Sequence, residues 1–216
     1  CDIAGAYRYL GQSQRAMKEY EQALVDLNST DDPVTRGLVL ANAAVAYADQ
    51  GDLQSADAFF TEAITIAVST GDRPAEAVRR GNYGWFKNAV GRPREAIAIL
   101  EHALSISREQ RLALAAAVQT DNLGLAHESL ENRSAALSYH EQALEQARAL
   151  DDAHWEAVIA TNLGAALLRR DRRDEAAALL AQALAQGRAA GDIEVIVRAL
   201  TGQARLLLGA GQSGEA

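Results

Sequence analysis

The sequence predicts an all-α protein, built as one solenoid of about five and a half antiparallel helix pairs. Small residues recur at a step of 40 positions along the chain, which is typical of a repeat architecture. Alanine and leucine together make up a third of the chain, and both are strong helix formers. Within each repeat, apolar residues recur at three- and four-residue spacing, as along one face of a helix.

Four columns of residues fix the period, and they run through the chain without an insertion. The first contains Ala23, Ala63, Ala103, Ala143 and Ala183. Seven positions earlier stand Ala16, Ala56, Ala96, Ala136 and Ala176. A third column holds Ala44, Gly84, Gly124, Gly164 and Ala204, and two residues before it stand Asn42, Asn82, Asn122 and Asn162. Two helix axes approach to about 8 Å when small side chains lie at the crossing, so we expect one close crossing in each repeat.

Each repeat is expected to fold as two helices joined by a turn. The turns carry Gly11, Gly51 and Gly91, with Glu131 or Asp171 in the later repeats; glycine suits the left-handed residue that ends a helix. A proline at position 93 fits the first turn of a helix. Turn and N-cap residues separate the repeats at 29–33, 69–72, 150–152 and 190–192. The expected helices are one near residue 2, 13–28, 34–50 with 53–69, 74–90 with 93–109, 112–130 with 133–149, 153–170 with 173–189, and 193–209.

The repeats predict a single domain over residues 1–216, because one helix pair cannot bury its apolar face alone whereas stacked pairs can. The last expected helix carries Leu206, Leu207 and Leu208 without a second helix to cover them. We therefore expect that the polypeptide continues, or that this end pairs with a second copy as a homo-oligomer. The expected units are roughly 1–30, 34–70, 74–110, 112–150, 153–190 and a partial unit at 193–216.

Composition argues against several functional classes. The net charge of −8 leaves no basic footprint for nucleic acid. No apolar run approaches the roughly 18 residues that a membrane helix needs, and no signal peptide is found, so we expect a cytoplasmic protein that does not contact the membrane. The single Cys1 excludes a disulfide framework and a cysteine-based zinc site. The chain has neither a phosphate-binding GxxxxGK loop nor a GxSxG motif, so we expect neither an enzyme nor a cofactor.

The repeated residues resemble the tetratricopeptide repeat family over essentially the whole chain. The matching residues in one unit are Asn162, Leu163, Gly164 and Leu167, then Ala176, Leu180, Ala183 and Leu184. The 40-residue unit exceeds the usual 34 and is similar to the long-helix variety of kinesin light chains and of the sensor regions of bacterial signalling ATPases and transcription regulators. The resemblance implies a right-handed superhelix whose first helices line the concave side. A strong excess of Arg over Lys, with the high alanine content, is typical of a GC-rich bacterial genome.

The asparagine column is the leading candidate for a binding site. A carboxamide offers two donors and an acceptor, so the side chains of Asn42, Asn82, Asn122 and Asn162 could hold the backbone of an extended peptide in the concave groove. Related repeats use such asparagines to hold target peptides. The alternative is that each asparagine bonds to a neighbouring helix and fixes the stacking of the repeats.

Residues near these asparagines are expected to share the groove. Trp85 is the sharpest candidate, because aromatic anchors dominate protein interfaces; the alternative is that Trp85 fills a hole between repeats. The charged candidates would suit a ligand of mixed charge, or are simply solvated. The remaining candidates are Asn88, Asp121, Glu128 and Arg169.

Two histidines depart from the repeat pattern. His127 stands where Tyr47 stands in another unit, and His140 replaces Tyr20. Both are expected to face the inside of one helix pair, with Glu131 one turn after His127. Two histidines and a carboxylate can bind a metal, and a pH-sensitive pair is a second interpretation. We favour two tolerated polar replacements and predict no metal.

The predicted function is a non-enzymatic protein–protein interaction module, or scaffold, that binds an extended peptide or a partner domain in its groove. The alternative is a sensor or regulatory domain of a larger bacterial signalling or transcription-regulator protein, which switches an attached ATPase or DNA-binding domain. In that case the partner is a domain of the same polypeptide. A purely structural spacer is a third interpretation.

Overall fold

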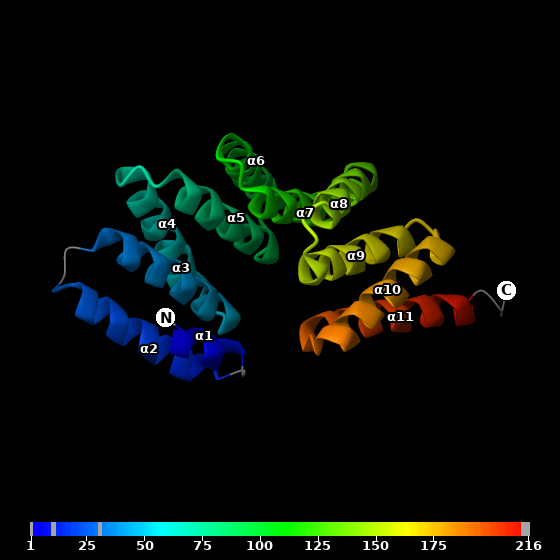
Figure 1. Ribbon diagram of the computed structural model, residues 1–216, viewed down its shortest axis with the longest axis horizontal. Coiled ribbons are helices and arrows are strands. Elements are labelled where there is room, and N and C mark those ends of the chain that lie inside the picture. Colours follow the sequence, from blue (N-terminus) through cyan, green and yellow to red (C-terminus); the bar gives the residue numbers. More distant parts are fainter. Residues whose placement is uncertain (1, 10–11, 30–31, 213–216) are drawn as a thin grey trace. The chain divides into compact units, whose positions relative to one another are not determined.

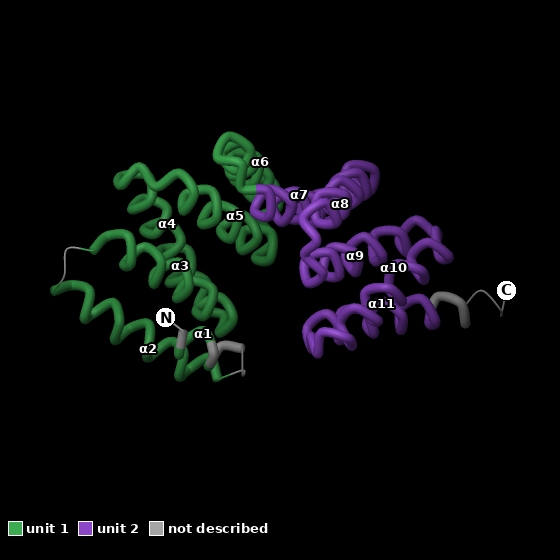
Figure 2. Tube along the Cα trace, viewed as in Figure 1, with its two compact units in different colours: residues 1–112 green, residues 113–216 purple. Residues whose placement is uncertain are grey.

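The computed structural model describes residues 2–9, 12–29 and 32–212, and this part of the chain forms eleven helices and no strand (Figure 1). The chain divides into two compact units, residues 1–112 and 113–216 (Figure 2). Unit 1 contains α1 (Asp2–Tyr9), α2 (Ser13–Leu27), α3 (Pro33–Asp49), α4 (Leu53–Ser69), α5 (Arg73–Ala89) and α6 (Pro93–Glu109). Unit 2 contains α7 (Ala113–Ser129), α8 (Arg133–Arg148), α9 (Ala153–Leu168), α10 (Arg173–Ala190) and α11 (Ile193–Gln212). The predicted all-α class is confirmed.

The predicted helix pairs are also confirmed. In the four pairs from α3 to α10, every helix begins and ends close to its predicted bounds. Odd-numbered helices are the first helices of the repeats, and even-numbered helices are the second. Within each unit, every helix packs against the next one along the chain. First helices of neighbouring repeats also touch, since α3 contacts α5 in unit 1 and α9 contacts both α7 and α11 in unit 2.

The helix starts follow from local sequence. Asp32 and Asp152 precede α3 and α9, and their Oδ1 atoms accept backbone N–H groups of the first helical turn at 3.0 and 3.1 Å. Such caps satisfy donors that have no partner within the helix. Pro93 lies in the first turn of α6, where its missing N–H is not needed. The predicted N-cap and proline positions are therefore confirmed.

The helix ends contain left-handed residues, as the glycine positions predict. Gly51 and Gly91 have φ angles of 82° and 78°. Glu131 and Asp171 adopt similar angles of 58° and 59°, although a side chain makes this conformation costly. Gly11, which is predicted to form the same turn, lies outside the described residues. The repeat therefore imposes one turn geometry whether or not glycine is present.

The small-residue columns lie at helix crossings. A Cβ atom added to Gly84 would lie 2.5 Å from Cγ of Leu100, and one added to Gly124 would lie 2.6 Å from Cε1 of His140. At these two positions a side chain larger than hydrogen would require Leu100 or His140 to shift. Ala204, in the same column, is exposed on α11. The following residues of the two alanine columns are buried: Ala16, Ala56, Ala63, Ala96, Ala103, Ala136, Ala143, Ala176 and Ala183.

The last helix has an open apolar side. Leu207 and Leu208 on α11 are 71% and 72% exposed. Cover for them by further chain or by a second copy stays a prediction, as does the organisation as a single domain. Among the described helices, none is long and apolar enough to cross a membrane.

Candidate functional site

In unit 1, α3 and α5 carry a face on which unpaired amide groups alternate with exposed apolar groups. Leu38 and Asn42 lie on α3, and Val78, Asn82 and Trp85 lie on α5. Their spacing of three or four residues places them on one side of each helix. The three apolar residues are 49%, 46% and 39% exposed in that order along the chain. Within the described residues, neither asparagine side chain makes a hydrogen bond.

Trp85 lies at the surface of this face rather than inside the repeat stack. Its side chain is 39% exposed, whereas Phe60 and Phe86 in the same unit are buried. Asn88, one turn further along α5, is half-buried. Its Oδ1 atom is buried and has no hydrogen-bond partner among the described residues. This end of α5 therefore combines an exposed aromatic side chain with an amide whose unpaired oxygen is buried.

In unit 2, the equivalent candidates pair with one another. Asp121 on α7 lies with its Oδ1 atom 2.6 Å from Nδ1 of His140 on α8. Asn162 on α9 donates its amide to Oδ2 of Asp121 at 2.7 Å. His140 is fully buried and Asp121 almost so. One carboxylate thus joins three consecutive helices.

A second link joins the same first helices. Glu128 on α7 forms an ion pair with Arg169, the residue that follows α9. Nε2 of His140 lies 3.8 Å from Oε1 of Glu128 and has no hydrogen-bond partner among the residues described. Asn122 is buried on α7. The asparagine column therefore divides into exposed or half-buried members without partners in unit 1 and buried or paired members in unit 2.

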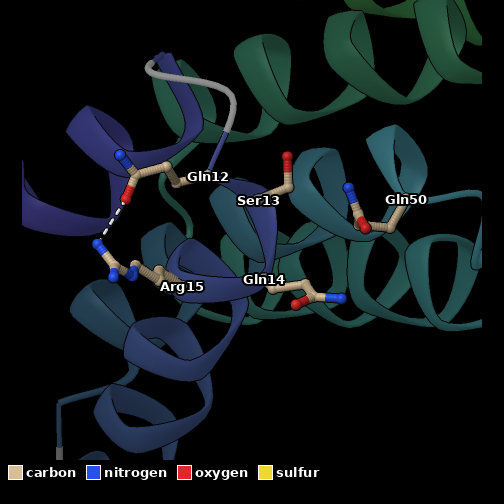
Figure 3. Close-up of a pocket in the computed structure, with 5 residues that line it drawn as sticks. All are labelled: Gln12, Ser13, Gln14, Arg15 and Gln50. Atoms are coloured by element: carbon tan, nitrogen blue, oxygen red, sulfur yellow. Dashed lines mark hydrogen bonds between the residues drawn. The ribbon is translucent and has the colours of Figure 1, made fainter.

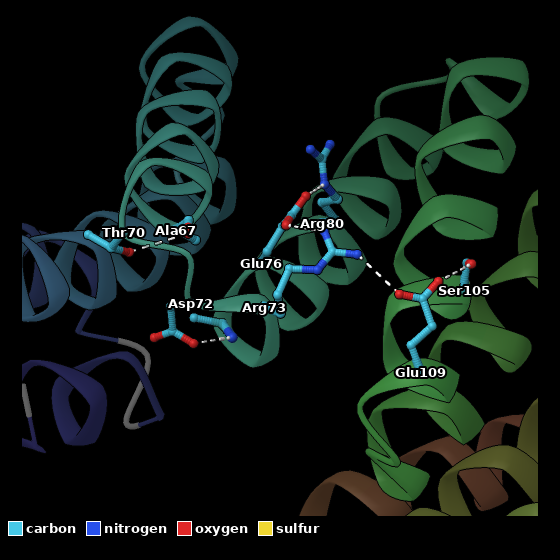
Figure 4. A network of polar contacts seen from close by, with 9 residues as sticks. Ala67, Thr70, Asp72, Arg73, Glu76, Arg80, Ser105 and Glu109 are labelled. Atoms are coloured by element: carbon cyan, nitrogen blue, oxygen red, sulfur yellow. Dashed lines mark hydrogen bonds and ion pairs between the residues drawn. The ribbon is translucent and has the colours of Figure 1, made fainter.

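A network of arginines and carboxylates lies on α5 and α6 (Figure 4). Glu76 is buried, and its two oxygens accept hydrogen bonds from Arg73 at 2.7 Å and Arg80 at 2.8 Å. Burial raises the pKa of Glu76, but the hydrogen bonds from Arg80 and Arg73 outweigh it and bring the pKa below its ordinary value. Arg73 also reaches Glu109 at 3.3 Å. The carboxylate is ionised and fixes both arginines.

A wide polar depression of about 520 Å³ lies at the start of α2 (Figure 3). A hydrogen bond of 2.8 Å from Arg15 to Gln12 crosses one side of it. The described residues of its walls include no apolar side chain and no carboxylate, so they provide little for specific recognition. It is lined by Gln12, Ser13, Gln14, Arg15 and Gln50.

The two histidines have separate environments. His127 stacks on Tyr139, with ring centroids 5.2 Å apart, whereas His140 bonds to Asp121. Glu131 is exposed in the turn after α7. Among the described residues, no group of three or more histidine, cysteine, aspartate or glutamate side chains is placed to hold a metal ion.

The repeat geometry agrees with comparison to known proteins. A profile described as Tetratricopeptide repeat matches residues 36–109 and 114–189, and a second of the same description matches residues 1–24. The chain belongs to the tetratricopeptide repeat family. The repeat fold is a scaffold for protein interaction. No curated protein sequence matches the chain.

Solved structures of tetratricopeptide repeats share this fold. Repeats assigned to a kinesin light chain of Podosopora anserina superpose with a TM-score of 0.67 at 20% identity, over 88% of this chain and 93% of that one. A Rap protein complexed with Competence and Sporulation Factor superposes with a TM-score of 0.79 at 15% identity, over 98% of this chain and 65% of that one. A signal transduction ATPase with a tetratricopeptide repeat sensor from Pyrococcus horikoshii superposes with a TM-score of 0.74 at 17% identity, over 93% of this chain and 31% of that one.

Sequence reasoning missed a polar cluster inside this tetratricopeptide repeat chain. Lys87 is buried on α5 and pairs with Asp57 on α4, which also accepts the hydroxyl of Tyr83 at 3.0 Å. Burial raises the pKa of Asp57, but the bonds from Lys87 and Tyr83 outweigh it and lower the pKa below its usual value. A carboxylate at position 57, where other repeats have Met17 and Leu137, was the signal for this cluster.

Proposed function

We propose that the chain binds an extended segment of a protein partner on the face of α3 and α5. The observation that carries the proposal is the exposure of Trp85 beside Asn82, whose amide has no partner within the described residues. An extended peptide presents backbone C=O and N–H groups that need partners. The amides of Asn42 and Asn82, one repeat apart on neighbouring helices, can hold these groups whatever the peptide's sequence.

The apolar residues would supply affinity and the amides would supply register. Leu38, Val78 and Trp85 flank the two asparagines along their helices. Burying such side chains against a ligand contributes roughly 25 cal/mol per Å² of apolar surface. An aromatic side chain is the usual centre of such an interface. We therefore expect a ligand with an apolar residue that covers Trp85.

Unit 2 carries candidates of its own, and the proposal assigns contact with a ligand of that unit to the more accessible ones. Arg169 is exposed and Asn162 is half-buried, so each can contact a ligand while keeping its internal partner. Asp121 and Asn122 are buried, and the role of Asp121 in the proposal is to position Asn162, whose amide it accepts. Glu128 anchors Arg169, and Asn88 extends the face beside Trp85.

A second candidate function is regulation inside a larger protein. The Rap protein and the signal transduction ATPase are named for a bound factor and for a repeat sensor, and this chain spans 65% and 31% of their lengths. The same face would then bind a peptide signal or a domain of the same polypeptide. The cytoplasmic location, the lack of catalysis and the lack of a cofactor stay predictions.

Peptide display followed by affinity measurement tests the proposal. Peptides selected on the chain would be titrated, by fluorescence anisotropy, against the wild type and single variants. We expect Trp85→Ala to lose at least about tenfold in affinity and Asn82→Ala about fivefold. Gln54→Ala, at an exposed position on the second helix α4, is the control and should bind like the wild type. Selected peptides that bind all four proteins equally would contradict the proposal.

Methylation of the peptide backbone separates the amide clamp from side-chain recognition. A peptide methylated at the nitrogen that faces Asn82 should bind the wild type more weakly than the unmethylated peptide does. In Asn82→Ala the two peptides should bind with nearly equal affinity. Equal losses in both proteins would show that Asn82 does not hold the backbone.

A further inference from the structure

A pocket of about 470 Å³ lies between the second helices α8 and α10 of unit 2, whereas the proposed peptide face is formed by first helices. Leu163 and Leu167 of α9 form its floor, and both are buried. Glu141 and Leu144 of α8 and Leu179 of α10 form its walls. The remaining lining residues are Glu145, Arg148, Arg172, Glu175 and Ala178.

The same place in unit 1 is filled by a tyrosine. Because the repeat recurs at a step of 40 positions, Leu167 corresponds to Tyr47, three repeats earlier. The hydroxyl of Tyr47 donates to Oε1 of Glu21 at 2.5 Å. Its ring meets that of Phe59 edge-on, with centroids 5.1 Å apart. In the second repeat, one aromatic side chain therefore occupies the space between the second helices.

Each partner of that tyrosine has a counterpart in the pocket wall. Glu141 corresponds to Glu21, since Glu141 precedes Leu167 by the same interval at which Glu21 precedes Tyr47. Leu179 corresponds to Phe59, and Leu144 corresponds to Leu24, which packs against the apolar cluster that contains Tyr47. The acceptor and the apolar wall are thus retained, whereas the phenol is absent.

Shorter side chains explain why the space is open. Leu167 and Leu179 replace two aromatic rings, and a leucine at 167 has no donor for Glu141. Leu163 is larger than its counterpart Ala43 and fills part of the floor, but the pocket remains above it. Glu141 is left with Arg172 at 3.7 Å, a loose ion pair between half-exposed groups. Arg172 is held more closely by Glu175, at 2.6 Å.

We propose that this pocket binds the side chain of a tyrosine from a partner protein, with the phenol hydroxyl donating to Glu141. The ring would lie against Leu144, Leu167 and Leu179, as the ring of Tyr47 lies within its own repeat. This site is independent of the peptide face on α3 and α5, so the failure of either proposal leaves the other standing.

Nuclear magnetic resonance titration with small probes tests the proposal. N-acetyl-tyrosine amide, added to the ¹⁵N-labelled chain, should give saturable shifts at the amide signals of Leu144, Leu167 and Leu179. N-acetyl-phenylalanine amide lacks only the hydroxyl, and it should bind about fivefold more weakly, because a hydrogen bond to a carboxylate is among the stronger kinds. Equal binding of the two probes, or no saturable shift at these residues, would overturn the proposal.

Two variants locate the site. Leu167→Tyr supplies the missing ring from within, as Tyr47 does in the second repeat, and should abolish probe binding. Glu141→Gln retains the pocket and should weaken the tyrosine probe toward the phenylalanine value. The side chain of Glu141 is half-exposed, so we expect Glu141→Gln to fold normally. This variant still tests the site if Leu167→Tyr does not fold. Glu19→Gln, at an exposed position on α2, is the control for loss of one negative charge. Unchanged tyrosine binding in Glu141→Gln would contradict the assigned hydrogen bond.

Discussion

Nδ1 of His140 lies 2.6 Å from Oδ1 of Asp121 inside the α7–α8 pair, at a crossing that other repeats fill with apolar groups. The counterparts of His140 are Tyr20, which is almost fully buried, and the apolar Phe60, Leu100 and Leu180, which are fully buried. His140 is equally buried, and among the described residues Asp121 holds the one carboxylate within hydrogen-bond distance of its ring. Asp121 and His140, which both differ from their counterparts in other repeats, therefore depend on each other. The histidine needs an acceptor and the aspartate needs a donor, and both side chains are buried.

Replacing His140 alone should leave the aspartate without its main partner. We expect His140→Leu to lower the free energy of unfolding by about 3 kcal/mol, because a buried carboxylate that loses its partner carries its desolvation cost. Asn162 would still donate to Asp121, which limits the loss. Urea unfolding followed by circular dichroism measures the change.

Replacing both residues should be milder than the sum of the single changes. Asp121→Thr introduces the residue that Thr161 provides at the same position of the next repeat. In the double variant with His140→Leu, we expect a coupling energy of at least about 1 kcal/mol. Additive effects would show that the two side chains do not stabilise each other.

The elements of the fold were predictable because period and turn chemistry agree. The 40-position step placed each helix, and Gly51 and Gly91 placed the turns closely. Which polar groups would pair was harder to predict from the sequence. Asp121 and Glu128 stand seven residues apart, on one side of α7, but this spacing does not show that His140 bonds to Asp121 rather than meeting His127. Such contacts depend on the stagger between helices, which the period does not specify.

The candidate site was predictable as a set of positions and not as a set of environments. Asn82 and Asn162 occupy the same column, yet the first is exposed and the second donates to Asp121. The difference arises because Asp121 replaces the small residues Ala41 and Gly81 one helix away. The position in the repeat therefore predicts which side of a helix a residue occupies. The side chains around that residue decide whether it is available to a ligand.

Gly84 and Gly5 should respond in opposite ways to the same substitution. A Cβ on Gly84 would lie 2.5 Å from Leu100, whereas a Cβ on Gly5 meets none of the described residues within 4 Å. We expect Gly84→Ala to destabilise by about 1–3 kcal/mol through overpacking. Gly5→Ala should stabilise by about 0.5–1 kcal/mol by favouring the helix. Thermal unfolding compares the two, and a stabilised Gly84→Ala would contradict the close crossing.

The left-handed turns give a second matched pair. Gly91→Ala places a side chain at φ 78° and should cost about 1–2 kcal/mol. Glu131→Gly removes a side chain from φ 58°; the relief is partly offset by the greater freedom of glycine in the unfolded chain. We expect Glu131→Gly to be neutral or to stabilise by up to about 1 kcal/mol. Chemical denaturation measures both, and a Glu131→Gly loss as large as that of Gly91→Ala would argue against strain at the turn.

Tyr47 should make stability depend on pH in the alkaline range. Burial, together with the hydrogen bond to Glu21 and the charge of that carboxylate, raises the pKa of Tyr47 to about 12, against about 10 in an unfolded chain. The folded state therefore holds the phenol proton more tightly than the unfolded state. This contribution to the free energy of unfolding is fully present below pH 10 and is lost as the pH rises through 12.

Tyr47→Phe isolates this contribution. Phenylalanine keeps the ring against Phe59 but has no proton to lose. Near pH 8 we expect the wild type to be more stable than the variant by about 1 kcal/mol, the usual net value of a hydrogen bond. Between pH 10 and 12 that advantage should shrink, because only the wild type must ionise a buried phenol when folded. Urea unfolding at a series of pH values measures the difference, and a constant difference across this range would show that Tyr47 ionises equally well in the folded and unfolded states.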